Sequence, residues 1–277
     1  MSLFIASLNS GSNGNCYYIG NRHEAVLVDC GISCREIDKR MKRLKLDMAK
    51  VKAIFVSHEH TDHISGIATL CKKYQLPVYI TPGTISDSGL VISPNLITPF
   101  CAGEAVAIGG LFVTPFSKYH DAGDPHSFIV QGSGVTVGIF TDLGRCCDQL
   151  VHYFKQCNAA FLESNYDVQM LETGKYPYYL KRRISGGMGH LSNAEALNLF
   201  VTHRPAHMSL LLLAHLSKNN NTPQLALNLF QKHAGNTHVA IAPRHEETRV
   251  YEIKNSKVIV NDFISTIRSV GLQMKMF

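Results

Sequence analysis

The chain lacks the sequence features that mark secreted, membrane-spanning and repetitive proteins. Its first 15 residues contain neither the basic segment nor the long apolar run of a secretory signal. The longest apolar run, around Leu210–Ala214, is far too short to span a bilayer. No internal repeat and no linker rich in proline, glycine and serine divides the 277 residues. We therefore expect a single domain over residues 1–277 that resides in the cytoplasm and contacts no membrane.

The chain also has no C-x-x-C pair, although it contains eight cysteines. They are scattered and several lie in apolar, strand-like segments, so we expect free and mostly buried thiols in a reducing compartment. Hydrophobic residues make up 45% and charged residues 17%, a balance that excludes a disordered chain. The formal net charge of +6 suits an acidic partner such as nucleic acid, but many enzymes with small substrates are equally basic.

Strand-like and helix-like segments alternate along the chain. Strand patterns occur at 3–8, 15–20, 24–29, 51–56, 78–80, 111–117, 126–131, 134–141, 159–163, 208–214, 237–242 and 248–253. Helix patterns occur near 33–46, 64–75, 145–156, 166–173, 192–203 and 222–234. The strands outnumber what one parallel sheet needs, and helices recur between them. This order predicts a mixed α/β protein with two sheets covered by outer helices, a four-layered arrangement.

The most informative segment is Ser57–His63, with the sequence SHEHTDH, which directly follows a predicted apolar strand. His58 and His60 are two residues apart at the strand end, so both imidazoles can project toward one metal ion. Asp62 and His63 follow where the loop turns into the next helix, beside a second ion. Imidazole and carboxylate ligands suit zinc, manganese or iron. The segment therefore predicts a dinuclear metal site.

The H-x-H-x-D-H segment resembles the second motif of the metallo-β-lactamase superfamily. The remaining motifs of that superfamily are similar to segments that occur here in the same order: Asp29 in VLVDCG, His120 in KYHD, Asp142 in FTDLG and His215 in LAHLS. The resemblance covers nearly the whole chain. It implies the superfamily's fold, a four-layered αββα sandwich.

The resemblance also implies a ligand set for two divalent ions. One ion would be held by three histidines, which are His58, His60 and His120. The other would be held by Asp62, His63 and His215, with Asp142 bridging both. Asp62 is expected to act in catalysis as well, and Asp29 would lie behind the ligands and orient them; a simple turn residue at a strand end is the alternative for Asp29. Two cations roughly 3.5–4 Å apart lower the pKa of a bridging water and stabilise an attacked ester.

Three features favour a phosphodiester substrate, and the first is His190 in the segment GHLSNAEA. It lies beside a predicted helix start, with Ser192 or Asn193 as the N-cap. The segment resembles the motif whose histidine helps tRNase Z-like nucleases to protonate the leaving oxygen. The pKa of a histidine lies near the working pH, which suits a general acid. A histidine that is simply ordered at a helix cap is the alternative.

The second feature is the tight polar loop 11–16, with the sequence GSNGNC. The loop's backbone amides, together with Ser12, Asn13 and the amide of Asn15, could hold a phosphate. A simple hairpin turn explains the glycines equally well.

The third feature is the segment 176–183, with the sequence YPYYLKRR, which interleaves aromatic and basic residues. Its tyrosines could stack on bases while Lys181, Arg182 and Arg183 contact phosphates, as single-strand binding requires. A solvated basic helix end is the alternative.

Several segments together resemble the YycJ/WalJ-like branch of the superfamily, which comprises bacterial single-domain proteins regarded as DNA exonucleases. The matching segments are GSNGNC, SKYHDAGDP, ESNYD and GHLSN followed by AHLSKNNN. Within them His126 stands where the pattern of that branch has an apolar residue, and we expect it to be a bystander. The chain between His120 and Asp142, and between Asp142 and His215, is too short for a tRNA-clamping arm or for the cap domain of β-CASP nucleases.

The sequence thus predicts a metal-dependent phosphodiesterase that uses a metal-bridged hydroxide. The resemblance to the YycJ/WalJ-like branch implies a DNA exonuclease of 5'-to-3' polarity. Its cofactors would be two divalent ions, zinc or manganese, with iron as a further candidate. A small-molecule hydrolase, such as a glyoxalase II-like thioesterase or a cyclic phosphodiesterase, is the second hypothesis and requires a closed, apolar pocket. A metal-binding scaffold without activity is the third. None of these motifs indicates the oligomeric state.

Overall fold

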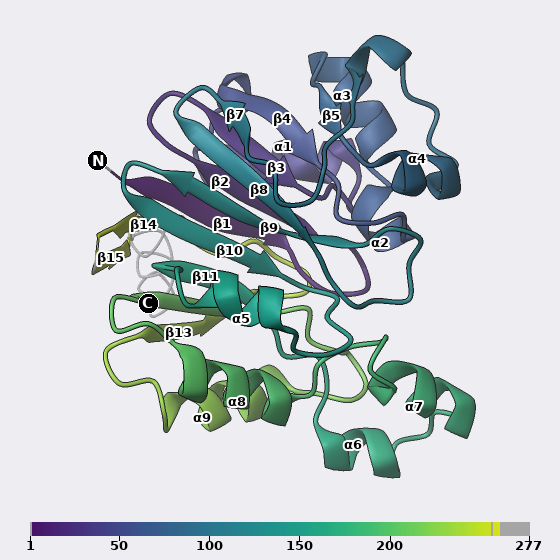
Figure 1. Ribbon diagram of the computed structural model, residues 1–277, viewed down its shortest axis with the longest axis vertical. Coiled ribbons are helices and arrows are strands. Elements are labelled where there is room, and N and C mark those ends of the chain that lie inside the picture. The colour runs from purple at the N-terminus through teal and green to yellow at the C-terminus, as the bar shows by residue number, and fades with distance from the viewer. Residues whose placement is uncertain (1, 256, 261–277) are drawn as a thin grey trace, which may run out of the picture.

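Two mixed β-sheets lie face to face at the centre of the computed structural model, which describes residues 2–255 and 257–260 (Figure 1). Within these residues the first sheet has eight strands in the order β15-β14-β1-β2-β3-β4-β5-β6, and the second has seven in the order β13-β12-β11-β10-β9-β8-β7. The strands of the first sheet are β1 Leu3–Asn9, β2 Cys16–Gly20, β3 Ala25–Val28, β4 Val51–Phe55, β5 Val78–Tyr79, β6 Ile97–Thr98, β14 Tyr251–Lys254 and β15 Lys257–Val260. Those of the second are β7 Val106–Ile108, β8 Leu111–Ser117, β9 His126–Gly132, β10 Val135–Phe140, β11 Ala159–Glu163, β12 Leu210–Ala214 and β13 His238–Ile241.

Helices cover the outer face of each sheet (Figure 1). Those near the first sheet are α1 Cys34–Arg43, α2 Thr61–Ile64, α3 Ile67–Tyr74 and α4 Pro82–Ser88, with 3-10 turns at Met48–Lys50 and Pro94–Leu96. Those near the second are α5 Asp148–Phe154, α6 Val168–Thr173, α7 Tyr178–Ser185, α8 Asn193–His203 and α9 Pro223–Gln231. No helix within the described part of the chain is both long enough and apolar enough to cross a membrane.

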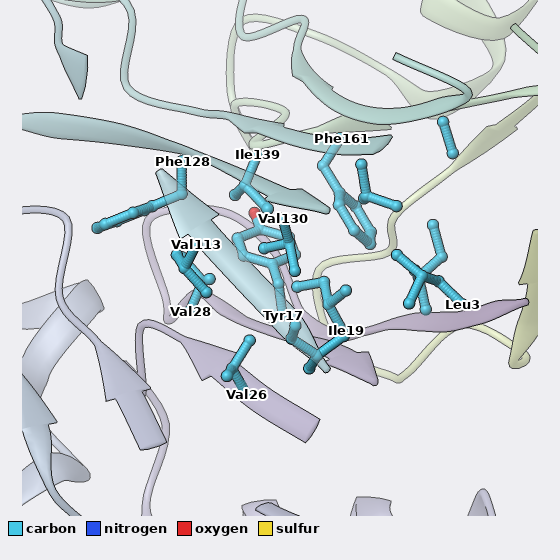
Figure 2. Close-up of a cluster of buried hydrophobic side chains, with 14 of the residues drawn as sticks. Leu3, Tyr17, Ile19, Val26, Val28, Val113, Phe128, Val130, Ile139 and Phe161 are labelled. Carbon is cyan, nitrogen blue, oxygen red and sulfur yellow. The ribbon is translucent and has the colours of Figure 1, made fainter. Parts of the chain in front are cut away.

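Three apolar interfaces hold these layers together. Figure 2 shows the one between the sheets, where Tyr17 and Val28 of the first sheet face Phe128, Ile139 and Phe161 of the second. The other face of the first sheet packs against α1 and α3, and the other face of the second packs against α5, α8 and α9. Three interfaces between four layers confirm the predicted αββα arrangement.

The topology gathers several strand ends at one edge of the sandwich. Strands β3, β4, β5 and β6 are parallel neighbours, and so are β10, β11, β12 and β13. Parallel neighbours end at the same edge, so the residues that follow β3 and β4 lie close together, as do those that follow β10, β11 and β12. Polar side chains placed directly after these strands can therefore converge on one site.

Some predicted element boundaries were wrong. The expected helix 64–75 begins at Thr61 and is interrupted between Ile64 and Ile67. Gly66 lies at the interruption, and a side chain there would lie 2.1 Å from the carbonyl oxygen of Ile32. The helices expected at 33–46 and 145–156 are shorter. Elements α4, α7, β6, β7 and β15 were not predicted, and β15 extends the regular structure beyond residue 253. The single domain over 1–277 stays a prediction, since residues 1, 256 and 261–277 lie outside the described residues.

Candidate active site

All seven predicted metal ligands lie together at the edge where the parallel strands end. Four of them follow β4, on the loop and the first turns of α2, and the other three follow β8, β10 and β12. They form overlapping groups whose ligand atoms lie within 4.8 Å of one another: His58, His60 and His120; Asp62, His63 and His215; and His58, His63 and Asp142. The structure thus brings together seven residues that follow strands of both sheets and that span 158 positions of the sequence, from 58 to 215.

The first group consists of three histidines with the spacing of a metal site. The Nδ1 atom of His60 lies 3.1 Å from Nε2 of His58 and 3.3 Å from Nε2 of His120. Nitrogen ligands about 2.1 Å from a tetrahedral ion lie roughly 3.4 Å apart, so the spacing fits. The Nδ1 atom of His120 donates to the carbonyl oxygen of Gly189 at 2.9 Å, which leaves its Nε2 as a ligand. Burial lowers the pKa of His58 well below its ordinary value and that of His120 to about 4, so both rings stay neutral and able to bind a metal.

The second group combines a carboxylate with two imidazoles. The Oδ2 atom of Asp62 lies 3.6 Å from Nε2 of His63 and 3.7 Å from Nε2 of His215, and Oδ2 of Asp142 lies 3.1 Å from the same nitrogen of His63. The buried atoms Oδ2 of Asp142 and Nε2 of His215 form no well-directed hydrogen bond among the described residues, although Oδ2 of Asp142 lies close to the ring of His63. Buried polar atoms are rarely left without such a bond. A divalent ion at this position would satisfy both atoms, and the residues fit such an ion.

The charges in this second group support the same conclusion. Burial alone would lower the pKa of His63, but the carboxylates of Asp142, Asp29 and Asp62 raise it to about 10. Burial would raise the pKa of Asp62, but His63 and His215 lower it to about 2. Protonated imidazoles thus balance the carboxylates in the metal-free chain. A bound cation would take over this role and release the protons.

Asp29 lies behind the ligands, where the resemblance places it. It is fully buried, and its carboxylate accepts hydrogen bonds from the backbone and hydroxyl of Ser57, each at 2.8 Å, and from Nδ1 of His63 at 2.7 Å. These bonds fix the ring of His63 and leave its Nε2 directed at the ligand group. Asp29, Asp142 and His215 all adopt a left-handed backbone, with φ of 58°, 54° and 54°. Each follows a strand, and strained residues of this kind collect at functional sites.

The glycine-rich loop packs against the second ligand group. Asn15 is buried, and its side-chain nitrogen Nδ2 lies 3.0 Å from Nε2 of His63 and 3.3 Å from Oδ2 of Asp62. Ser12 is exposed and lines the active-site cavity, whereas the side chain of Asn13 donates to the carbonyl oxygen of Arg244 at 2.7 Å. Of the three phosphate contacts predicted in this loop, Ser12 is therefore the one that reaches the cavity, and Asn15 is directed at the ligands. Their contact with phosphate stays a prediction.

His190 lies beside the ligands and is paired with a residue that the sequence reasoning missed. Its Nδ1 lies 2.8 Å from Oε1 of Glu163, which is fully buried at the end of β11 and is also 3.2 Å from Nδ1 of His215. Burial would raise the pKa of Glu163, but His190 lowers it to about 2. Ser192, the N-cap of α8, forms a capping box with Glu195, so the helix start fixes the segment that carries His190. The one local sign of Glu163 in the sequence is an acidic residue at the end of the otherwise apolar strand AAFLE, and this sign does not reveal its partners.

The cavity over these residues has a volume of about 540 Å³ and lies between α2 and α7, which Figure 1 shows at the same side of the molecule. Arg183 lines it, and its Nε lies 2.5 Å from Oδ2 of Asp121. Lys181 does not line the cavity, because its ammonium group donates to the carbonyl oxygen of Glu172 at 2.6 Å. Arg182 is exposed outside the cavity lining. The structure thus places one of the three predicted cations at the site.

Two further residues, His126 and Lys118, are buried and lie outside the cavity lining. His126 is buried, its ring lies edge-on to that of Phe100 with the ring centroids 5.2 Å apart, and it does not line the cavity. That it is a bystander stays a prediction. Lys118 was not singled out, yet it is buried below the site and donates to the carbonyl oxygen of Thr141 at 2.8 Å. Burial lowers the pKa of Lys118, although the carboxylates around it oppose the shift.

The fold and the ligand groups together define a metallo-hydrolase. Residues 24–215 match the family described as the beta-lactamase superfamily domain, and the chain therefore belongs to this superfamily. It is 36% identical over 233 residues to exodeoxyribonuclease YycJ from Bacillus anthracis, and this similarity covers 82% of this chain and 87% of that protein. It is 29% identical over 224 residues to exodeoxyribonuclease WalJ from Streptococcus pneumoniae strain D39, covering 79% of this chain and 83% of that protein. The solved metallo-beta-lactamase fold protein YhfI from Bacillus subtilis shares the fold with a TM-score of 0.71 at 17% identity, over 91% of this chain and 100% of that chain.

Proposed function

We propose that the protein is a two-metal phosphodiesterase that removes nucleotides from the end of DNA, in the 5'-to-3' direction. The observation that carries this proposal is the pair Glu163–His190, which lies beside a complete ligand set inside a polar cavity. A metal site alone suits many hydrolases of this fold. A histidine held in place next to it suits the cleavage of a poor leaving group such as an alkoxide. The similarity to proteins named exodeoxyribonuclease supports DNA as the substrate.

The residues present fit two divalent ions, held by the seven ligands described above. Zinc or manganese best matches a set of imidazoles and carboxylates, and iron is also compatible. When bound, the ions supply Lewis acidity, which makes a water a better nucleophile and stabilises the charge on the phosphoryl oxygens.

The remaining chemistry is performed by the chain's own residues. Glu163 accepts a hydrogen bond from Nδ1 of His190, so Nε2 is the nitrogen left to donate a proton to the leaving oxygen. Asp29 and Asn15 hold Asp62 and His63 in place from behind. Ser12 and Arg183 lie at the cavity wall, where they would meet the oxygens of a phosphate backbone.

The cavity lining argues against the second hypothesis, a thioesterase or cyclic phosphodiesterase with an apolar pocket. Among the described residues that line it, only Leu180 and Ile184 are aliphatic, and most of the others are ionisable or can form hydrogen bonds. A charged backbone suits such a wall better than a thioester does.

The unpaired cysteines favour a reducing compartment, and we infer a cytoplasmic location. All eight are free, and five of them are buried. Cys101 and Cys146 are exposed, so the expectation of buried thiols holds for most of the cysteines but not for these two.

The test is a digestion of end-labelled DNA and RNA, single- and double-stranded, with zinc and with manganese. We expect stepwise release of nucleotides from one end of DNA, and no release by the Asp142→Asn variant. Preferential cleavage of RNA would correct the substrate. Protein with both ions bound that cleaves a glutathione thioester and leaves all four nucleic acids intact would refute the proposal.

A further inference from the structure

A second cavity, of about 380 Å³, adjoins the active-site cavity. The two share Ser217 in their linings, and Arg244 lies in the wall of the second one. The rest of the floor is mostly apolar and is formed by Leu216, Pro223, Ile241, Ala242 and Pro243. Three more ionisable side chains line this cavity: Lys218, His245 and Glu246. An apolar floor with a cationic wall, open toward a metal site, has the chemistry to hold a nucleotide.

Arg244 carries a guanidinium group that no carboxylate neutralises within residues 2–255 and 257–260. In this part of the chain its side chain makes one hydrogen bond, from Nη1 to the carbonyl oxygen of Leu216 at 3.1 Å, and its buried Nε has no partner. Burial lowers the pKa of Arg244, while the carboxylate of Asp62 opposes that shift. A partly desolvated cation without a counter-ion is unfavourable for folding. Such a group is therefore a candidate for binding an anion.

The backbone around Arg244 is fitted closely to the glycine-rich loop. A side chain at Gly11 would lie 2.6 Å from Nη1 at the end of the Arg244 side chain, and the φ of +119° at Gly11 is a conformation that favours glycine. The side chain of Asn13 donates to the carbonyl oxygen of Arg244 at 2.7 Å. Ser12 lies between these two residues and lines the active-site cavity. The loop thus connects Arg244 to the metal site.

We propose that Arg244 and this cavity bind the nucleotide next to the scissile phosphate. The guanidinium group of Arg244 binds the neighbouring phosphate, which is not cleaved, and the apolar floor of the cavity accepts the base. Arginine suits this role because its planar fork of donors matches the oxygens of a phosphate. Lys218 and His245 add positive charge at the wall, and Glu246 is the one acidic group that opposes them. This assignment rests on the proposed phosphodiesterase activity.

The test uses substrates that differ by one phosphate. Thymidine 3'-(4-nitrophenyl phosphate) is compared with the same ester bearing a 5'-phosphate, and thymidine 5'-(4-nitrophenyl phosphate) with its 3'-phosphorylated form. In the wild type, the extra phosphate should raise kcat/KM about tenfold or more in one of the two pairs, as a charge-assisted hydrogen bond would. Arg244→Met should lose this gain and still hydrolyse the esters without the extra phosphate. Arg35→Met, which removes an exposed cation on α1, is the matched control and should keep the gain.

Three results would overturn the subsite. The first is that the extra phosphate raises kcat/KM in neither pair, and the second is that it raises kcat/KM equally in the wild type and in Arg244→Met. The third is that Arg244→Met lowers kcat/KM equally on all four esters, which would indicate a purely structural role. If the wild type with both ions bound hydrolyses none of the esters, the proposed activity fails, and the subsite is decided by binding. Thymidine 3',5'-bisphosphate should then bind more tightly than thymidine 5'-monophosphate to the wild type, and equally tightly to Arg244→Met. Equal affinities in the wild type would reject the subsite.

Discussion

At the scale of single residues, the site depends on side chains whose conformation is fixed by buried hydrogen bonds. Asp29 holds His63, and Glu163 holds His190 and His215, so each acid orients a base that faces the cavity or the ligands. None of these acids lines the cavity. Their effect on the reaction must therefore come through the residues they position.

The first prediction concerns His190, whose proposed role is to donate a proton. His190→Ala should keep both metal ions and lower the cleavage of DNA roughly 10²–10⁴-fold, the range for the loss of a general acid. The loss should be much smaller on a nitrophenyl phosphodiester, because nitrophenolate leaves without protonation. Elemental analysis and paired kinetics check this. Lost metal, or equal impairment on both substrates, would rule out the acid role.

The second prediction concerns Glu163 and pH. Its pKa in the folded protein, about 2, lies below the ordinary value of 4.5, so its charge stabilises the fold fully above pH 4.5 and less and less as the pH falls toward 2. A shift of this size corresponds to a few kcal/mol, on the order of 3. In metal-free protein, Glu163→Gln should lower the free energy of unfolding clearly at pH 6 and by roughly half as much or less at pH 3, measured by urea titration. Glu172→Gln, on the surface, should show no such difference. A penalty that does not depend on pH would contradict the assignment.

At the scale of secondary-structure elements, α7 is the helix whose sequence most directly suggests contact with the proposed substrate. No residue of this helix is buried, and Tyr178 and Tyr179 are 76% and 75% exposed. A helix without a buried face gains little from packing. It is nevertheless tied to the loop after β8 by the ion pair of Arg183 with Asp121, so we infer that it forms one wall of the cavity, with Arg183 as its cation.

The third prediction separates the cations of α7. Binding to single-stranded DNA should weaken with salt, and each phosphate contact adds roughly 0.7 to the log–log slope. Arg183→Met should reduce the slope by about one contact, while Arg182→Met, a matched exposed cation outside the cavity lining, should leave it nearly unchanged. Fluorescence anisotropy over a salt series measures both. Equal effects of the two variants would place the DNA elsewhere on α7 or away from it.

Elements with a strong apolar pattern could be predicted from the sequence, and short or exposed ones could not. Strands β11 and β12 are buried along their whole length, and β4 is buried at every position except Lys52, so all three show near-continuous apolar runs. Strand β6 has two residues and β7 has three, too few for a periodicity. Helix α4 begins with Pro82-Gly83 and is followed by Gly89, so its sequence resembles a turn.

The same distinction applies to the site. The ligands in H-x-H-x-D-H are local in sequence, so a motif could reveal them. The roles of Glu163 and Arg244 arise only from tertiary structure. Glu163 meets His215 because β11 pairs with β12, and it meets His190 across 27 positions of the chain. Arg244 meets Gly11 across 233 positions.

At the scale of the whole molecule, the metal site joins the two sheets. The ligands His58, His60, Asp62 and His63 follow a strand of the first sheet, and the other three follow strands of the second. The interface between the sheets is otherwise apolar. Bound ions would therefore add a polar link at one edge of an interface that the hydrophobic effect already holds together.

The last prediction follows from this link. Ions that bind the folded chain and not the unfolded one stabilise it by about 4 kcal/mol at a thousandfold excess over Kd. For a protein of this size, chelation should then lower Tm by roughly 10 °C. Asp142 lies within reach of ligands from both groups, so Asp142→Asn should show a much smaller difference between the metal-loaded and chelated states. Calorimetry with elemental analysis measures this, and Asp148→Asn, an exposed surface change, is the control.

Hydrogen exchange can locate the effect of chelation within the molecule. Amides of the loop after β4 and of the segments after β10 and β12 should exchange faster without metal, whereas those of the apolar interface around Tyr17 and Phe161 should change little. The apolar interface does not need the ions to form, and the strained residues Asp142 and His215 would lose the bonds that hold their left-handed backbone. If faster exchange instead spread evenly through both sheets, the ions would be part of the core's stability and not a link at its edge.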